Sequence, residues 1–342
     1  MKKVVISKYG GPEVLKLVDA KKDDLGPRQI RLKTHFAGVN FSEIMARMRL
    51  YPGAPAPPSG IGVEASGIVE SIGDEVSRYA VGDRLMGLCK YSSYASHVTM
   101  DEDMAIPVPD HFTMEHAAAF PVIYMTAYMM IFDQCNIRKG DSILILGAGG
   151  GVGTALIHLS KLVGAKILAA SSSWKHGKIQ DLGADICIDY RVQNWEGKIH
   201  ENTDGLGADI IIDPLGAASW KKMINCLAPL GKLVIYGDQY MVSGPRANIF
   251  RVAKEFLSIP KFNPLKMMSK NQAVVGFHLG RLMGMEKKVQ RSLHSLIAMV
   301  EANGVLPVVD RSFHGSKAAD AHSYIQDRKN FGKVLIDFRD IG

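Results

Sequence analysis

A glycine-rich loop between an apolar run and a helical pattern constrains the fold of this chain more than any other feature. The run SILIL ends at Leu146, glycines occupy positions 147, 149, 150, 151 and 153, and a helical pattern continues from there. Glycines admit close approach of the backbone to a diphosphate, and a helix N-terminus offers free N–H groups. The strict G-x-G-x-x-G spacing fails, but A-x-G-x-x-G fits Ala148, Gly150 and Gly153. The pattern predicts a dinucleotide-binding loop, with a purely structural glycine turn as the alternative.

Strands and helices alternate along the chain from about Thr113 to residue 280. The strands KILAAS, DICIDY, ADIIID and KLVIYG are apolar, which is typical of a parallel sheet with both faces covered. Residues 1 to about 109 instead contain short strand-like runs punctuated by Gly, Pro and Asp. We therefore predict a doubly wound α/β domain joined to an irregular, mostly antiparallel β unit.

Length and composition indicate a globular protein of about two domains. The 342 residues are 47% hydrophobic and 22% charged, and the net charge of +7 is not gathered into one block. No nucleic-acid partner is therefore expected. The four cysteines lie far apart, which fits a reducing compartment, and the longest uncharged apolar run, 117–132, is too short to span a bilayer. We expect a cytoplasmic protein.

The end of the second predicted strand bears on the choice of cofactor. An acidic residue at that point binds the adenosine ribose hydroxyls in NAD-dependent proteins. This chain has Ser171, Ser172, Ser173 and Lys175 there, and no carboxylate before Asp181. Hydroxyl groups and an ammonium group suit a 2′-phosphate, so NADPH is the predicted cofactor. The alternative is a solvated helix N-terminus, because serine is a common N-cap residue.

Motifs along nearly the whole chain resemble the medium-chain dehydrogenase/reductase superfamily. They are AGVNFSE (37–43), GVEASGIVESIG (62–73), GDR (82–84), GGVG (150–153), LGAD (182–185) and IDYR (188–191). A second set resembles the zinc-independent quinone oxidoreductase branch, most of all its vesicle amine transport protein homologues. That set is TAYMM (126–130), DPLG (213–216), YG (236–237), GPRAN (244–248) and AVVGFHLG (273–280).

The resemblance implies an architecture, a partner and a substrate class. A Rossmann sheet would be inserted into a GroES-like irregular β domain. Residues 1–120 and 281–342 would form the GroES-like substrate domain, and residues 121–280 the NADP-binding domain. The active site would lie between the domains, the substrate would be a small carbonyl compound or quinone, and the protein would be a homodimer.

The resemblance also implies roles for particular residues. Asn40 would bind the nicotinamide ribose or the substrate, Tyr51 matches a tyrosine that related enoyl reductases use as a proton donor, and Tyr124 is a third polar group for the cleft. Their alternatives are a turn residue, loop packing and core packing, respectively. The cofactor-binding residues would be Asn40, Thr126, Gly150, Gly151, Val152, Gly153, Ser171, Lys175, Tyr190, Gly237 and Phe277. For the two aromatic residues in that set, the alternative is plain core packing.

No metal site is expected. Zinc alcohol dehydrogenases of this superfamily have a cysteine where this chain has Asn40, and a histidine where it has Val63. An amide and an isopropyl group do not form that zinc site. Two function classes then remain. The first is an NADPH-dependent reductase of quinones or α,β-unsaturated carbonyls. The second is an NADPH-binding sensor or adaptor with little turnover, which would associate with membranes at most peripherally.

The segment 243–271 departs from the α/β pattern. It holds six lysines and arginines against one acid, Glu255, interleaved with large apolar residues. We expect one helix followed by an irregular return. Three interpretations compete: a lid over the substrate, contact with an acidic membrane surface, or an ordinary amphipathic helix whose apolar face packs on its own domain.

Overall fold

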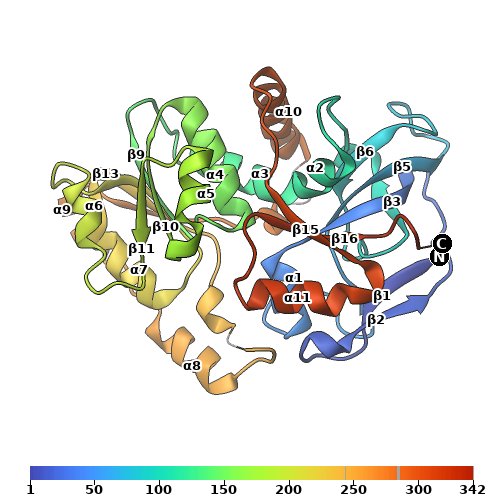
Figure 1. Cartoon of the computed structure of the whole chain (residues 1–342), viewed down its shortest axis with the longest axis horizontal. Coiled ribbons are helices and arrows are strands. Elements are labelled where there is room, and N and C mark those ends of the chain that lie inside the picture. Colours follow the sequence, from blue (N-terminus) through green and yellow to red (C-terminus); the bar gives the residue numbers. More distant parts are fainter. Residues whose placement is uncertain (243, 283–285, 342) are drawn as a thin grey trace. The chain divides into compact units, whose positions relative to one another are not determined.

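The structure is a computed structural model that describes residues 1–242, 244–282 and 286–341. The chain forms two compact units (Figure 1). Unit 1 comprises Met1–Ile123, Ser243–Ala247 and Ile297–Gly342, and unit 2 comprises Tyr124–Val242 and Asn248–Leu296. The assignment of residues 1–120 and 281–342 to a substrate domain stays a prediction.

Unit 2 is built on a parallel sheet. Its strands are β9 (Ser142–Leu146), β10 (Lys166–Ser171), β11 (Ile186–Asp189), β12 (Ala208–Asp213), β13 (Leu227–Ile235) and β14 (Ala273–Gly276). In the described residues their order is β11-β10-β9-β12-β13-β14, and every pairing is parallel. This is the doubly wound order of dinucleotide-binding folds, in which the chain reverses direction across the sheet beside β9. The predicted Rossmann sheet is confirmed.

Helices connect these strands. They are α4 (Gly151–Val163), α5 (His176–Leu182), α6 (Gly197–Glu201), α7 (Ala217–Met223), α8 (Ile249–Ser258) and α9 (Pro264–Lys270). The buried sheet residues, among them Leu144, Leu168 and Ile211, pack with Trp220 and Met223 of α7. Since both faces of the sheet are covered, the strands are apolar at nearly every position, as the sequence predicts.

Unit 1 is mostly antiparallel. Its strands are β1 (Lys2–Ile6), β2 (Leu15–Asp19), β3 (Gln29–Val39), β4 (Ser59–Gly60), β5 (Glu64–Ile72), β6 (Arg84–Leu88), β7 (His97–Asp101), β8 (Ala105–Pro107), β15 (Val309–His314) and β16 (Lys333–Asp337). Its helices are α1 (Phe41–Arg47), α2 (Met114–Ala119) and α11 (Ala318–Gln326). The helices α3 (Pro121–Tyr128) and α10 (Glu286–Ala302) each contain a boundary between the units. The C-terminal strand β16 pairs with β3, so the chain returns to complete the N-terminal sheet.

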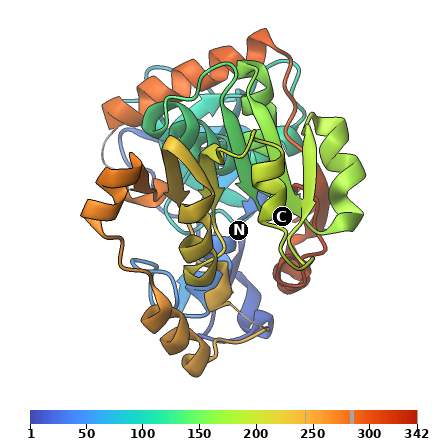
Figure 2. The same cartoon turned by 90° about the vertical axis from the view of Figure 1, so that its left-hand side faces the viewer.

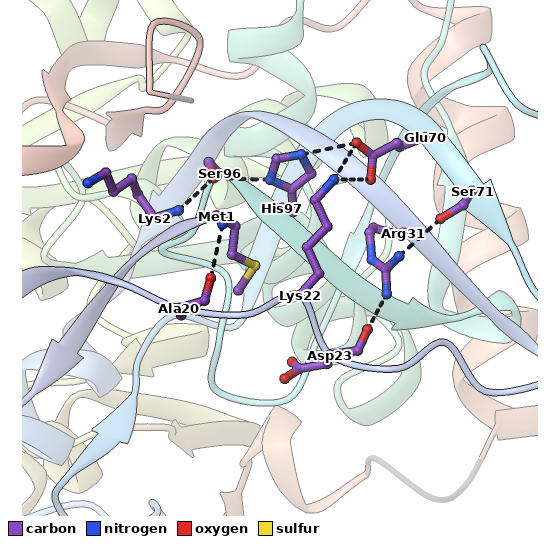
Figure 3. A network of polar contacts seen from close by, with 10 residues as sticks. All are labelled: Met1, Lys2, Ala20, Lys22, Asp23, Arg31, Glu70, Ser71, Ser96 and His97. Atoms are coloured by element: carbon purple, nitrogen blue, oxygen red, sulfur yellow. Dashed lines mark hydrogen bonds and ion pairs between the residues drawn. The ribbon is translucent and has the colours of Figure 1, made fainter.

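A surface network fastens the N-terminal segment to this sheet (Figure 3). The Lys22 ammonium donates to the Glu70 carboxylate at 2.7 Å, and His97 Nε2 lies 3.2 Å from the same carboxylate. Ser96 Oγ accepts from the Lys2 backbone N–H at 3.0 Å. Burial lowers the pKa of the His97 imidazole. Each charged group here has a partner within the unit, which indicates a structural role.

A buried ion pair lies where three segments of unit 1 meet. Lys333 Nζ of β16 lies 2.5 Å from Glu64 Oε1 of β5, and both side chains are almost fully buried. The β3–β16 register aligns Val334 with Val39, which places Lys333 beside Asn40. Gly38 faces Glu64 across β3 and β5, and a Cβ on Gly38 would lie 2.4 Å from Glu64 Oε1. The glycine therefore leaves the space that the carboxylate occupies.

The segment 243–271 differs from the prediction. The structure forms two helices, α8 and α9, in place of one helix and an irregular return. The large apolar side chains of α8 are exposed to solvent, Phe250 by 84% and Leu257 by 89%. The interpretation in which the apolar face packs on its own domain is therefore wrong. The physical reason is that the polar face of α8 makes the contacts with unit 2. Glu255 accepts from the Ala217 N–H of α7, and Arg251 donates to the Tyr240 carbonyl.

A search of the described residues for a helix long and apolar enough to cross a membrane finds none.

The buried ion pair yields a first prediction. Lys333→Met leaves the Glu64 carboxylate buried without its cation, which costs about 3–5 kcal/mol of unfolding free energy. Lys329→Met, at the exposed Lys329–Asp327 pair, is the matched control and should cost less than about 1 kcal/mol. Denaturant unfolding of both variants measures the difference. Equal losses would contradict the assignment of a structural role to the buried pair.

Candidate functional site

The glycine loop of unit 2 connects β9 to α4. Gly147 has φ +69°, and the N–H of Gly150 donates to the Gly147 carbonyl at 2.9 Å, which closes a tight turn. Gly150 is the N-cap of α4, and no side chain caps this helix. The N–H groups of the first turn have no acceptors within the helix, and the helix dipole makes this end positive. The loop therefore offers an anion N–H donors that no capping side chain occupies.

One glycine of the loop is required by space, and a second lies against the Lys175 side chain. A Cβ on Gly153 would lie 2.5 Å from the carbonyl oxygens of Gly147 and Ala148, so only glycine fits without a shift of the backbone. A Cβ on Gly149 would lie 2.4 Å from Cδ of Lys175. The Lys175 side chain therefore extends over the loop, although it comes from the segment after the neighbouring strand.

The carboxyl end of β10 supplies the next polar groups. Ser171 is the last residue of β10, and its side chain is buried. Lys175 follows in a short 3-10 turn, is 8% exposed, and places its ammonium 5.0 Å from the centre of the Trp174 ring. Because β9 and β10 are parallel neighbours, their carboxyl ends bring the glycine loop and Lys175 to one edge of the sheet.

The carboxyl end of β11 adds a residue that sequence reasoning missed. Arg191 Nη2 donates to Ser173 Oγ at 2.8 Å and pairs with the Asp189 carboxylate at 2.7 Å. The hydrogen bond from Arg191 holds the pKa of the Asp189 carboxyl well below its usual range. The predicted residue Tyr190 lies beside them, with its hydroxyl 3.4 Å from Ser172 Oγ. A cationic residue two positions after the end of an apolar strand was the available signal for Arg191.

Two further predicted residues lie past the neighbouring strands on the other side of β9. Gly237 follows β13, and Phe277 follows β14 with its ring buried. The Phe277 N–H donates to the Ile235 carbonyl at 2.9 Å, which fixes this backbone beside β13. Thr126 lies in α3 and is 6% exposed. The structure thus places the glycine loop, Ser171, Lys175, Tyr190, Gly237 and Phe277 at the carboxyl ends of the sheet strands, where α/β folds bind ligands.

The residues at this edge fit a dinucleotide. A Cβ on Gly150 would meet only the Gly147 carbonyl oxygen, at 3.3 Å, and the first turn of α4 supplies N–H donors. Hydroxyl groups and cations occupy the end of β10, where an acidic residue would favour NAD.

Tyr124 makes its polar contact inside unit 2. The side chain is fully buried in α3, and its hydroxyl lies 2.8 Å from His158 Nδ1 of α4. Burial raises the pKa of the Tyr124 hydroxyl and lowers the pKa of His158 to about 4, so the pair is neutral at pH 7. His158 was not predicted as a partner, because nothing in the sequence relates it to Tyr124.

Asn40 belongs to a buried cluster of unit 1. Its amide Nδ2 donates to Glu64 Oε1 at 2.8 Å and to Glu43 Oε1 at 3.2 Å, and its Oδ1 accepts from Lys333 at 2.6 Å. The cluster holds two carboxylates against one ammonium, and the ammonium contacts Glu64. Burial raises the pKa of Glu43 to about 7. Tyr51, by comparison, is half-buried in the turn after α1.

The described residues contain no group of three His, Cys, Asp or Glu side chains placed to hold a metal ion. The positions that correspond to zinc ligands in the resemblance carry Asn40, engaged as above, and Val63. These donors do not fit a zinc ion.

Two family models match the chain. The alcohol dehydrogenase GroES-like domain matches residues 26–110, and a zinc-binding dehydrogenase model matches residues 182–336. The chain is 34% identical to the human synaptic vesicle membrane protein VAT-1 homolog, over 97% of this chain and 85% of that protein. It is 29% identical to a quinone oxidoreductase of Pseudomonas aeruginosa, over 98% of this chain and 99% of that protein.

Solved structures agree with this result. A mycobacterial protein complexed with NADPH matches with a TM-score of 0.86 at 26% identity, over 98% of this chain and 100% of that chain. The fold and the matches define a medium-chain dehydrogenase/reductase with a GroES-like domain, which confirms the predicted fold class. The chain belongs to this superfamily, in the branch that contains VAT-1 homologues and quinone oxidoreductases.

The loop geometry gives a second prediction. Gly153→Ala should weaken NADPH binding at least about tenfold and lower stability, because its Cβ would lie 2.5 Å from two carbonyl oxygens, closer than van der Waals contact allows. Gly177→Ala in α5 is the control, since its Cβ would meet nothing within 4 Å. Fluorescence titration with NADPH and thermal unfolding measure both effects. If both variants bind NADPH as the unmodified protein does, the packing argument is wrong.

The buried carboxyl gives a third prediction. Folded Glu43 retains its proton up to about pH 7, whereas the unfolded chain loses it near pH 4.5. The folded state binds more protons between these values, so this group makes the protein less stable as the pH rises through that window. Glu43→Gln removes the effect. The unfolding free energy of the variant relative to the unmodified protein should increase from pH 5 to pH 7.5, and a constant difference would contradict the raised pKa.

Proposed function

We propose that this protein is a zinc-independent, NADPH-dependent oxidoreductase that reduces quinones or α,β-unsaturated carbonyl compounds by hydride transfer. The observation that carries the proposal is the carboxyl edge of the unit 2 sheet. There an uncapped helix N-terminus and the Lys175 side chain converge on one glycine loop. The similarity to a quinone oxidoreductase supports the substrate class.

The chain's own residues would divide the binding of NADPH among three strand ends. Backbone N–H groups of 151–153 would hold the diphosphate, and the backbone of Gly150, whose own N–H donates to the Gly147 carbonyl, would lie against it. Ser171, Lys175 and Tyr190 would surround the 2′-phosphate, and Arg191 would join them by exchanging part of its contact with Asp189 for the phosphate. Thr126, Gly237 and Phe277 would line the nicotinamide. When bound, NADPH supplies the hydride.

The reduction of a carbonyl compound also needs groups that stabilise negative charge on oxygen. Asn40, Tyr51 and Tyr124 are the proposed polar groups. Glu43, Glu64 and Lys333 fix the orientation of the Asn40 amide, which would position it for the nicotinamide ribose or the substrate. The proposal also includes residues 1–120 with 281–342 as the substrate domain, a homodimer, and a cytoplasmic location.

A second candidate function is an NADPH-binding protein with little turnover. The observation that favours it is that two of the proposed catalytic groups are engaged inside their own units. Tyr124 contacts His158, and Asn40 contacts Glu64 and Lys333.

The fourth prediction separates the two functions. The purified protein should oxidise NADPH in the presence of an ortho-quinone or a small enone, at the same rate with and without a metal chelator. NADPH oxidation is followed by absorbance, and NADPH binding by fluorescence on the same sample. Binding without turnover of either acceptor would overturn the reductase and favour the binding protein. Loss of activity in chelator would overturn the metal-free assignment.

The fifth prediction concerns the choice of cofactor. Lys175→Ala should raise the apparent KM for NADPH at least about tenfold and change the KM for NADH much less, because a charge-assisted contact to phosphate is worth about 1.5–3 kcal/mol. Arg191→Ala should act in the same direction. The control is Lys198→Ala, whose ammonium pairs with Glu201 on α6. Equal effects of Lys175→Ala on both cofactors would remove this residue from the 2′-phosphate site.

A further inference from the structure

Helix α8 is attached to unit 2 by polar contacts. Glu255 is its one buried residue, and the Glu255 carboxylate accepts from the Ala217 N–H at the start of α7 at 2.5 Å. Arg251 lies four positions earlier, on the same side of the helix, and its Nε donates to the Tyr240 carbonyl at 2.6 Å. Figures 1 and 2 show α8 at the periphery of unit 2, beyond α7 from the sheet. These two polar contacts therefore hold the helix on unit 2.

A second carboxyl group meets Glu255 beside Gly216. Asp238 follows Gly237 after the end of β13, and Asp238 and Glu255 are each only 9% exposed. A Cβ built on Gly216 would lie 2.6 Å from Asp238 Oδ1 and 2.6 Å from Glu255 Oε1, so the two oxygens are at most twice that distance apart. Gly216 has φ +140°, which glycine alone adopts readily, and its missing side chain leaves the space in which the two carboxyl groups meet.

The Asp238 carboxyl group is buried without a neutralising partner. Both of its oxygens lack a hydrogen-bond partner among the described residues. Burial, followed by the like charge of Glu255, raises the pKa of Asp238 to about 6, and the backbone N–H groups of Tyr240 and Met241 offset only part of this rise. Two negative charges this close in a buried place are unfavourable, so the pair keeps one proton to a higher pH than an exposed carboxyl group does.

Other titratable groups lie on the elements around the pair. Asp213 at the end of β12 accepts from the Leu215 N–H at 2.7 Å and from the Ser219 hydroxyl at 2.5 Å. Burial raises the pKa of Asp213 to about 7, with a contribution from the Asp238 charge. Burial also raises the pKa of Tyr236, which therefore stays neutral. The turn after β13 adds Tyr240, and the other charged side chains of α7 and α8 are exposed: Lys221, Lys222, Arg251 and Lys254.

We propose that Asp238 and Glu255 share one proton and act as a pH-sensitive latch for α8. With the proton present, the pair carries one negative charge and one O–H donor, and α8 stays on unit 2. Loss of the proton to solvent leaves two carboxylates beside each other, and their repulsion is relieved when α8 moves away with Glu255. The docked pair holds a proton more tightly than two separated carboxyl groups do. Helix α8 is therefore held at low pH and released as the pH rises through the range in which the docked pair ionises.

The test is hydrogen–deuterium exchange of the full-length protein at pH 5 and pH 7.5, read by mass spectrometry on peptides from α8 and, as a reference, from α4. Protection factors are corrected for the intrinsic effect of pH on exchange. The protection of α8 should fall at least about tenfold from pH 5 to pH 7.5, whereas that of α4 should change less than about twofold.

Two variants assign this change to the pair. Asp238→Asn removes one ionising group and keeps a hydrogen-bond donor, so the protection of α8 should be equal at the two pH values within about twofold. Glu196→Gln is the matched control. It removes a carboxylate that pairs with Lys222 of α7 at 2.6 Å, away from the latch, and should keep the fall in protection.

Several results would overturn the latch. They are equal protection of α8 at both pH values in the unmodified protein, or an unchanged fall in Asp238→Asn. If Asp213→Asn removes the fall and Asp238→Asn does not, the titrating group is Asp213. Protection that is lost in a metal chelator at both pH values would show that the pair holds a cation and not a proton. Circular dichroism checks folding, and Glu255→Gln, whose amide oxygen can still accept from the Ala217 N–H, replaces Asp238→Asn if that variant does not fold.

Discussion

The buried pair of Lys333 and Glu64 is the interaction on which unit 1 depends. It joins a strand near the C-terminus to a strand near residue 70, and Asn40 bridges the two groups. Charges taken out of water are tolerated only when they are paired and hydrogen-bonded, so the pair forms only if β3, β5 and β16 are in register. The same constraint fixes the orientation of Asn40, a residue proposed to act on the cofactor or the substrate. The same buried cluster therefore holds the strands in register and orients a residue proposed to bind the cofactor or the substrate.

Unit 2 obeys a different constraint. Its parallel strands all end at the same edge, and the order reverses beside β9. Gly153, Lys175 and Arg191 are distant in sequence, but each follows a strand of this sheet. The order of the strands, and no local sequence pattern, therefore brings them to the same edge. Position 153 of the loop has to be glycine, because the Gly147 and Ala148 carbonyls occupy the space that a Cβ at Gly153 would need.

Helix α8 shows the limit of pattern reasoning. Its sequence indicates an amphipathic helix, and periodicity alone favours burial of the apolar face. The structure buries the polar face, because Glu255 and Arg251 satisfy backbone groups of α7 and the turn before α8. Hydrophobic periodicity shows that a helix has an apolar and a polar face. It does not show which of the two packs against the rest of the protein.

The sequence by itself determined the Rossmann sheet, the β-rich unit, the glycine loop and the superfamily. Apolar runs of strand length, their alternation with helices and the A-x-G-x-x-G spacing are patterns of neighbouring residues. Such patterns can be recognised from the sequence alone. Only the tertiary structure decided that Arg191 lies at the proposed 2′-phosphate site, that Tyr124 contacts His158, and that Lys333 pairs with Glu64. Those contacts join residues 18 to 269 positions apart, and strand order and register, which no local pattern encodes, bring them together.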